Sequence, residues 1–147
     1  MDNHYFTKDN VQFQVEAVDW QDAIRVGVSI LEYNGYVNQL YADEVIKNVL
    51  EYGPYIVIAP GIAIPHTRPE NGALSVGMSL ITLKDPILFQ QEEPPVKVMI
   101  SFSATDSNEH LEIIKTIVKI AEKGLVDDIW RIHNVDQLNE LIGEGSQ

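Results

Sequence analysis

The residues best suited to chemistry lie in one short proline-containing segment around His66. Pro65 and Pro69 flank this histidine, and each lacks a backbone N–H and biases the preceding residue away from helix. The segment is therefore predicted to be a rigid turn from which the imidazole projects. Arg68 follows two residues later. A neutral imidazole is a nucleophile near neutral pH, and a guanidinium beside it can bind the anion that arrives.

Three further histidines are not equivalent to this one. His4 lies near the N-terminus and His133 at the end of a predicted helical piece, so both are interpreted as structural or incidental. His110 lies in the first turn of a predicted helix that begins at Asp106. The free N–H groups at such a helix end stabilise phosphate and bias a nearby imidazole toward its neutral form. His110 is a solvated first-turn residue when taken alone, and becomes a candidate only beside His66.

Simpler interpretations of these residues stay open. His66 could be a loop histidine that only hydrogen-bonds the backbone, and Arg68 could be solvated or weakly paired with Glu70. A metal-dependent hydrolase that uses His66, His110 and a carboxylate is a further alternative, although Arg68 would oppose a dication there. The sequence has none of the usual motifs of serine hydrolases, nucleotide-binding loops or zinc proteases.

Composition narrows the class of protein. The 147 residues suit a single domain, 1–147, and the lack of cysteine excludes disulfides, thiol nucleophiles and thiolate metal sites within the chain. With 22 acidic against 10 basic residues, the net charge of −12 repels nucleic acid and anionic lipid. Phosphate chemistry would therefore need local donors or a basic partner protein. No signal segment or membrane-length apolar stretch is seen, which predicts a cytoplasmic protein.

The elements that must position these residues alternate between strands and helices. Periodicity predicts strands at 11–15, 55–58, 62–64, 75–83 and 96–102, and helices at 20–33, 39–52, 106–123, 126–132 and 135–142. Asn38 is the expected N-cap of the 39–52 helix, and Asp106 and Glu109 are spaced as a capping box. The predicted apolar stripe of that later helix is Leu111, Ile114, Val118 and Ala121. A connection is expected at 85–95 and a frayed end at 143–147. The pattern predicts an α/β fold with a mixed β-sheet flanked by helices.

Parts of the chain resemble a known family. The run Gly61-Ile62-Ala63-Ile64-Pro65-His66 resembles the phosphorylation signature of the mannitol/fructose-type enzyme IIA of the bacterial phosphoenolpyruvate-dependent sugar phosphotransferase system (PTS). The longer run 52–66, with Arg68-Pro69-Glu70 after it, resembles the L-ascorbate-type enzyme IIA closely. Segments 79–84 and 104–110 match the same branch.

This resemblance implies a single-domain enzyme IIA fold and a phosphocarrier function. His66 would take a phosphoryl group from the phosphohistidine of HPr and pass it to a cysteine of enzyme IIB, while enzyme IIC moves the sugar. His110 matches the family's second active-site histidine. Arg68, Thr67 and the N–H groups after Asp106 would receive the phosphoryl oxygens, without a metal or nucleotide cofactor. The alternative is a regulatory enzyme IIA-like module that is controlled by phosphorylation of His66.

Two positions depart from the family pattern. Thr67 stands where the family usually has Gly, Ala or Ser, and Leu50 stands where the mannitol branch has an active-site arginine. Arg68 could have taken the role of that arginine. The aliphatic residues before His66 could belong to a docking surface for partner proteins or to the core, and core packing is the commoner role of alternating aliphatic residues.

Overall fold

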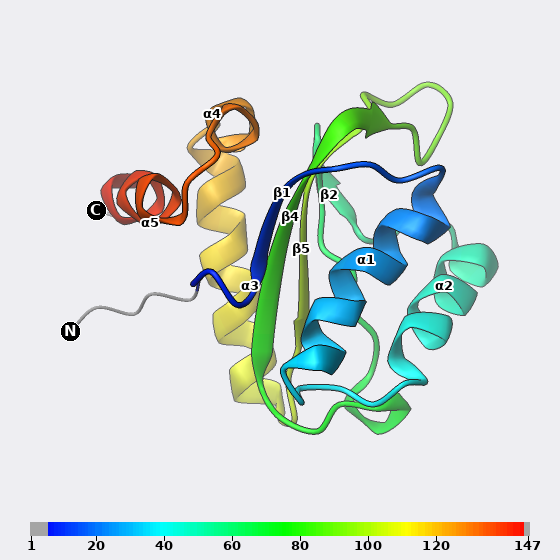
Figure 1. Ribbon diagram of the computed structural model, residues 1–147. Helices are drawn as coiled ribbons and strands as arrows, with labels where there is room; N and C mark the ends of the chain where they lie inside the picture. The colour runs from blue at the N-terminus through cyan, green and yellow to red at the C-terminus, as the bar shows by residue number, and fades with distance from the viewer. Residues whose placement is uncertain (1–5, 146–147) are drawn as a thin grey trace.

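The computed structural model describes residues 6–145 and has a five-stranded sheet with helices on both faces (Figure 1). The strands are β1 (Val11–Val15), β2 (Val57–Ala59), β3 (Ile62–Ala63), β4 (Gly77–Ile87) and β5 (Val96–Ser103). The helices are α1 (Trp20–Tyr33), α2 (Tyr41–Tyr52), α3 (Ser107–Glu122), α4 (Val126–Arg131) and α5 (Val135–Gly145), with a short 3-10 helix η1 (Pro69–Asn71).

The sheet is mixed, as predicted. Its strand order is β1-β4-β5-β3-β2. β1 runs parallel to β4 and β3 runs parallel to β5, while the pairs β4–β5 and β2–β3 are antiparallel. Two neighbouring parallel strands, β3 and β5, therefore end at the same edge of the sheet. In Figure 1 this is the lower edge, where β5 leads into α3.

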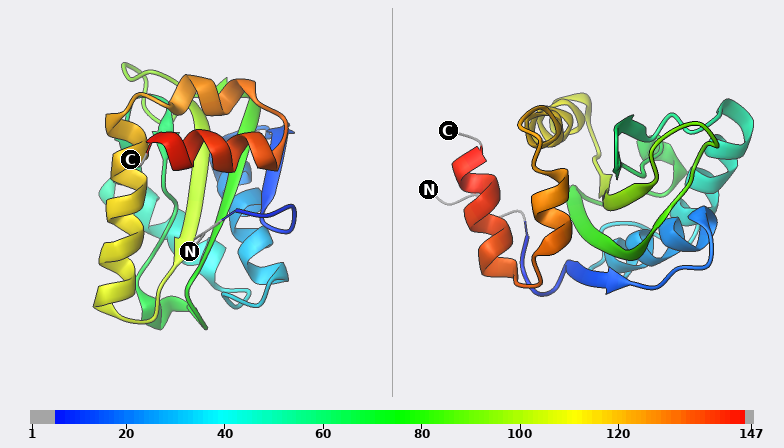
Figure 2. Two further views of the ribbon diagram at one scale, coloured as in Figure 1. Left: turned by 90° about the vertical axis from the view of Figure 1, so that its left-hand side faces the viewer. Right: turned by 90° about the horizontal axis from the view of Figure 1, so that it is seen from above.

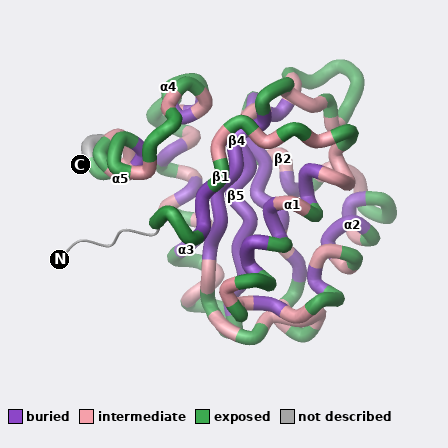
Figure 3. The backbone as a smooth tube through the Cα atoms, in the orientation of Figure 1, coloured by how far each residue is buried: buried purple, intermediate pink, exposed green. Residues whose placement is uncertain are grey.

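Each face of the sheet has its own apolar cluster. Ile81 and Met99 pack with α1 and α2, whereas Leu80 and Ile100 pack with α3, α4 and α5. The two helix layers lie on opposite faces of the sheet (Figure 2). Successive strand residues point to opposite faces, so strands covered on both sides are apolar at nearly every position. Figure 3 accordingly shows β4 and β5 buried over most of their length.

The first two helices differ in how well their predicted bounds agree with the structure. α1 begins and ends as predicted, and the side chain of Asp19 accepts a hydrogen bond from the N–H of Asp22 at 2.8 Å. α2 begins at Tyr41, two residues later than predicted, and Asn38 is not its N-cap. The Asn38 side chain instead accepts from the N–H of Leu40 at 2.9 Å, in a turn that precedes the helix.

Two strand boundaries also differ from the prediction. β2 starts two residues late because the N–H of Tyr55 donates to the carbonyl of Gly53 at 2.8 Å, within a turn. β4 continues to Ile87 through Pro86, which the sequence placed in a connection. The register between β4 and β5 shifts before Ile87 pairs with Val96, and such an irregularity accommodates a residue that cannot donate to the ladder.

The start of α3 has the predicted cap with one change. The side chain of Asp106 accepts from the N–H of Glu109 at 2.8 Å. The carboxylate of Glu109 reaches past Asp106 and accepts from both the N–H and the hydroxyl of Thr105, each at 2.9 Å. The reciprocal half of the capping box is therefore displaced by one residue.

The predicted apolar stripe of α3 is only partly right: Ile114 and Ala121 are half-buried against the core, but they are not its most buried side chains. Leu111 is 51% exposed, and the buried side chains are Ile113, Ile117 and Ile120. This face also contains His110, because residues three and four positions apart lie on one side of a helix. At the other end of the chain, α5 continues to Gly145, so the predicted frayed end is helical as far as the structure describes it, and residues 146–147 lie outside.

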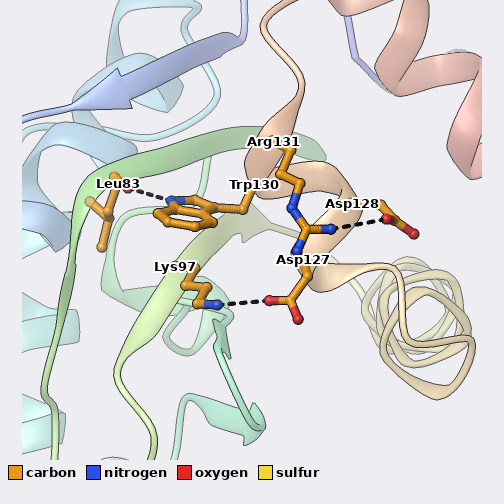
Figure 4. Close-up of polar contacts among 6 residues, drawn as sticks. All are labelled: Leu83, Lys97, Asp127, Asp128, Trp130 and Arg131. Carbon is orange, nitrogen blue, oxygen red and sulfur yellow. Dashed lines mark hydrogen bonds and ion pairs between the residues drawn. The ribbon is translucent and has the colours of Figure 1, made fainter.

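Helix α4 is attached to the sheet by polar contacts of one tryptophan and one lysine (Figure 4). The indole N–H of Trp130 donates to the carbonyl of Leu83 on β4 at 2.7 Å. Lys97 on β5 places its ammonium 4.8 Å from the centre of the indole ring and 2.8 Å from a carboxylate oxygen of Asp127. These contacts join α4 to both central strands.

We expect Trp130→Phe to lower the free energy of unfolding by about 1–2 kcal/mol, because one hydrogen bond is lost and the cation–π contact weakens. Urea unfolding measures this. Asp128→Asn is the matched control, since it removes a long 3.7 Å ion pair with Arg131 between two exposed side chains. That change should stay within about 0.5 kcal/mol. If the two substitutions lowered the free energy of unfolding equally, the attachment of α4 through Trp130 would be contradicted.

Candidate active site

The backbone that leads to His66 continues β3 and is held by hydrogen bonds. The N–H of Ile64 donates to the carbonyl of Ile56 at 2.8 Å, and the N–H of Phe102 on β5 donates to the carbonyl of Pro65 at 3.1 Å. His66 therefore leaves the sheet from a fixed point, at the edge where β3 and β5 end.

The imidazole of His66 has a defined tautomer. Its Nδ1 lies 2.6 Å from the carbonyl oxygen of Ile64. A carbonyl oxygen can only accept a hydrogen bond, so Nδ1 carries the proton and Nε2 has a free lone pair. The ring also stacks on Phe102, with ring centres 4.6 Å apart and planes 19° from parallel. The hydrogen bond and the stacking together orient Nε2.

His66 is more enclosed than the sequence predicted. It is half-buried rather than projecting freely, because Phe102 lies against one face of its ring and Tyr55 lies edge-on, with ring centres 5.6 Å apart. This burial lowers the pKa of His66. The hydrogen bond to Ile64 acts in the opposite direction, and the nearby His110 lowers the pKa further. The neutral, nucleophilic form is thus favoured at pH 7.

The lowered pKa of His66 predicts a pH-dependent stability. The unfolded chain, with a histidine pKa of about 6.5, binds a proton before the folded chain does as the pH falls. The wild type should therefore lose stability as the pH falls from about 6.5 toward the lower folded pKa. His66→Gln lacks this loss. Chemical unfolding at several pH values should show the stability difference shifting in favour of the variant at acidic pH, and parallel curves would contradict the prediction.

The structure brings His110 beside His66. The two ring centres are 5.5 Å apart and their planes make an angle of 63°. His110 also lies edge-on to Phe102 at 5.5 Å, so one phenylalanine supports both imidazoles. The first turn of α3 thereby borders the site.

Arg68 is exposed. It lines a cavity of about 360 Å³ together with both histidines. Within residues 6–145, its guanidinium forms no ion pair, so the suggested pairing with Glu70 is not present there. Leu50, which stands at the position of the mannitol-type arginine, is 67% exposed on α2 and does not line this cavity.

The side chain of Thr67 is engaged by two neighbouring asparagines at the wall of this cavity. The residue is only 7% exposed, and its hydroxyl oxygen accepts hydrogen bonds from the side-chain amides of Asn48 and Asn71 at 2.8 and 2.9 Å. The extra atoms of the threonine side chain are used to connect the His66 segment to α2 and η1. Thr67 is thus a structural part of the site.

Sequence reasoning missed the aromatic residues that hold this segment. The hydroxyl of Tyr55 donates to the carbonyl of His66 at 2.6 Å, and the N–H of Thr67 donates to the hydroxyl of Tyr41 at 3.2 Å. Burial raises the pKa of Tyr41 to about 12, so this hydroxyl stays protonated and can itself donate to the carbonyl of Phe102 at 2.8 Å. Only Tyr55 had a signal, its place in the run 52–66 that resembles the L-ascorbate-type enzyme IIA.

The other predicted possibilities find less support in the geometry. In the part of the chain that the structure describes, no three His, Cys, Asp or Glu side chains are grouped so that they could hold a metal ion. His133 is exposed and lies 3.5 Å from the amide of Gln14, away from this cavity. His4 lies outside the described residues.

Comparison with known proteins decides the family. The family described as "Phosphoenolpyruvate-dependent sugar phosphotransferase system, EIIA 2" matches residues 4–145. The chain belongs to this family. It is a PTS EIIA component and thus a phosphotransferase. Among residues 6–145, none of the helices of this EIIA protein is long and apolar enough to cross a membrane.

Relatives and solved structures agree with this assignment. The chain is 41% identical to the "Ascorbate-specific PTS system EIIA component" of Salmonella choleraesuis strain SC-B67 over 116 residues, which cover 78% of this chain and 75% of the relative. The protein with that description in Escherichia coli K12 is also 41% identical, over 115 residues, 77% of this chain and 75% of the relative.

Solved EIIA structures have the same fold. The mannitol-specific cryptic enzyme IIA CmtB of Escherichia coli has a TM-score of 0.85 and 30% identity, with 98% of this chain and 99% of CmtB covered. The E. coli complex of enzyme IIA-Mtl with phosphorylated enzyme IIB-Mtl has a TM-score of 0.82 at 20% identity, with coverage of 95% and 97%, which shows the fold alone.

Proposed function

We propose that His66 carries the phosphoryl group in this phosphotransferase and that Nε2 is the atom that accepts it. The observation that supports this most directly is the 2.6 Å contact between Nδ1 and the carbonyl of Ile64, which leaves the lone pair on Nε2. Burial favours the neutral ring by lowering the pKa of His66. A neutral imidazole with one fixed tautomer is the form required for attack on phosphorus.

The proposed reaction has two balanced steps. In the first, the Nε2 lone pair of His66 attacks the phosphorus of the phosphohistidine of HPr, and the donor's N–P bond breaks with its electron pair returning to the donor imidazole. In the second, a cysteine thiolate of enzyme IIB attacks the same phosphorus and the electron pair of the broken bond returns to Nε2. Nδ1 keeps its proton in both steps and donates a hydrogen bond through it to the carbonyl of Ile64.

Electrostatics support a role for Arg68 and His110 at the phosphoryl oxygens. Among the described residues that line the cavity at His66, Arg68 is the only one with a formal charge at pH 7. The rest of the chain carries a net charge that repels an anion. We propose that Arg68 offsets the charge of the phosphoryl group from the open side and that His110 donates a hydrogen bond from α3.

The proposal extends to the transport system. The 41% identity with two ascorbate-specific EIIA components supports L-ascorbate, or a sugar close to it, as the transported substrate of the associated enzyme IIC. In this role the chain would act as one domain in the cytoplasm, docking HPr and enzyme IIB in turn and binding no nucleic acid.

Intact mass after incubation with phosphoenolpyruvate, enzyme I and HPr tests this function. The wild type should gain one acid-labile phosphoryl group, and ³¹P–¹⁵N coupling in protein labelled at histidine should place it on Nε2. Addition of an ascorbate-type enzyme IIB should discharge the protein faster than a mannitol-type enzyme IIB. Absence of any phosphoryl gain would overturn the proposal, whereas phosphorylation without discharge would favour the regulatory alternative.

A further inference from the structure

We propose that Tyr55 is a positioning residue for phosphoryl transfer, because its hydroxyl holds the peptide group that carries His66. This inference rests on the proposed phosphorylation of His66. It concerns a residue outside the two histidines and the arginine that the sequence singled out.

The peptide group between His66 and Thr67 is held at both ends by tyrosine hydroxyls. At one end the hydroxyl of Tyr55 donates to the carbonyl oxygen of His66 at 2.6 Å, and at the other the N–H of Thr67 donates to the hydroxyl of Tyr41 at 3.2 Å. The orientation of this peptide group sets the backbone at His66 and thus the direction in which its side chain leaves the chain.

The two tyrosines are held in different ways. Tyr41 is 0% exposed and belongs to the apolar cluster that α1 and α2 form with the sheet. Its hydroxyl also donates a hydrogen bond to the carbonyl of Phe102 at 2.8 Å. Tyr55 is 40% exposed and lies in the turn between α2 and β2, where its ring is edge-on to the imidazole of His66. Tyr41 is therefore needed for packing, whereas the hydroxyl of Tyr55 contacts the His66 segment and contributes little to the core.

The rate of phosphoryl transfer should depend on the hydrogen bond between Tyr55 and the carbonyl of His66. The nitrogen nucleophile must lie in line with the bond that breaks, and a small displacement of a reacting atom lowers the rate strongly. The hydrogen bond from Nδ1 to Ile64 fixes the rotation of the His66 ring, but it does not fix the peptide group that follows. Without the hydroxyl of Tyr55, that peptide group would be held only at the end that contacts Tyr41.

Tyr55→Phe tests the proposal, with Tyr33→Phe as the matched control. Both substitutions remove one phenol oxygen, and Tyr33 is 88% exposed at the end of α1. Rapid-quench kinetics of transfer from phosphorylated HPr should show kcat lowered about tenfold in Tyr55→Phe, with KM unchanged. ¹⁵N relaxation dispersion should show new exchange at the amide of Thr67 in this variant and not in Tyr33→Phe.

The other outcomes separate this inference from the function on which it rests. If the wild type accepts no phosphoryl group, the proposed function fails and the inference fails with it. If the wild type transfers normally and Tyr55→Phe transfers equally fast, only the inference is overturned. A raised KM with unchanged kcat would also overturn it, because Tyr55 would then contact the partner protein instead of positioning His66.

Discussion

His66→Gln should gain no phosphoryl group from phosphorylated HPr, with a transfer rate at least about a thousandfold below that of the wild type. Glutamine retains polarity and much of the side-chain volume but has no basic nitrogen with a lone pair. The variant should keep the fold, because the segment is held through its backbone, by the N–H of Ile64 and the carbonyl of Pro65. Intact mass under non-acidic conditions and the far-UV circular dichroism spectrum measure the two properties.

His133→Gln is the control for this prediction. His133 is exposed and lies next to Gln14, away from the cavity at His66, so its replacement should leave the phosphoryl gain complete. Phosphorylation of a folded His66→Gln variant would show that another residue carries the phosphoryl group. Failure of both variants would point to a general loss of structure rather than of the nucleophile.

The sequence predicts the fold class well because both faces of the sheet impose simple patterns. β4 and β5 are covered by helices on both sides and appear as long apolar runs, and the apolar periodicity of 20–33 gives both ends of α1. The predicted stripe of α3 lies beside the most buried one for a physical reason. Between Leu111 and Ala121 both candidate stripes are apolar, so periodicity alone does not determine which one faces the sheet. Only the position of β5 decides it.

Errors at the ends of strands have a similar origin. Pro86 and Asp85 are typical of a connection, yet the structure keeps them within β4 because the register to β5 shifts beside them. Conversely, Tyr55 has a high preference for strands but lies in a turn fixed by the carbonyl of Gly53. Tertiary hydrogen bonds outweigh local preference at these positions.

Some features of the candidate site can likewise be predicted from the sequence, whereas others depend on the fold. His66 and Arg68 are neighbours in the chain, so their proximity follows from the sequence. The proximity of His110 follows from topology: His66 comes directly after β3, α3 comes directly after β5, and these two strands are adjacent and parallel. No local pattern reveals that pairing. The inward-facing hydroxyl of Thr67 was likewise hidden, because its partners, Asn48 and Asn71, lie on separate elements.

Substitution of His110 is expected to have the second largest effect on the rate of phosphoryl transfer. His110→Ala should still be phosphorylated on His66, but kcat for transfer should fall about a hundredfold, as when one donor to a developing negative charge is removed. The argument is geometric, since the two imidazoles lie 5.5 Å apart around the same phenylalanine and α3 thereby places a second imidazole beside His66.

Two further substitutions separate hydrogen bonding from packing at this position. His110→Phe keeps a ring against Phe102 without a donor, and His110→Asn keeps a donor without the ring. If His110 acts through a hydrogen bond to the phosphoryl oxygens, His110→Phe should be as slow as His110→Ala, and His110→Asn should recover about tenfold. The opposite order, with His110→Phe near the wild-type rate, would mean that His110 supports His66 only by packing, and that Arg68 and the N–H groups of α3 bind the phosphoryl group without it.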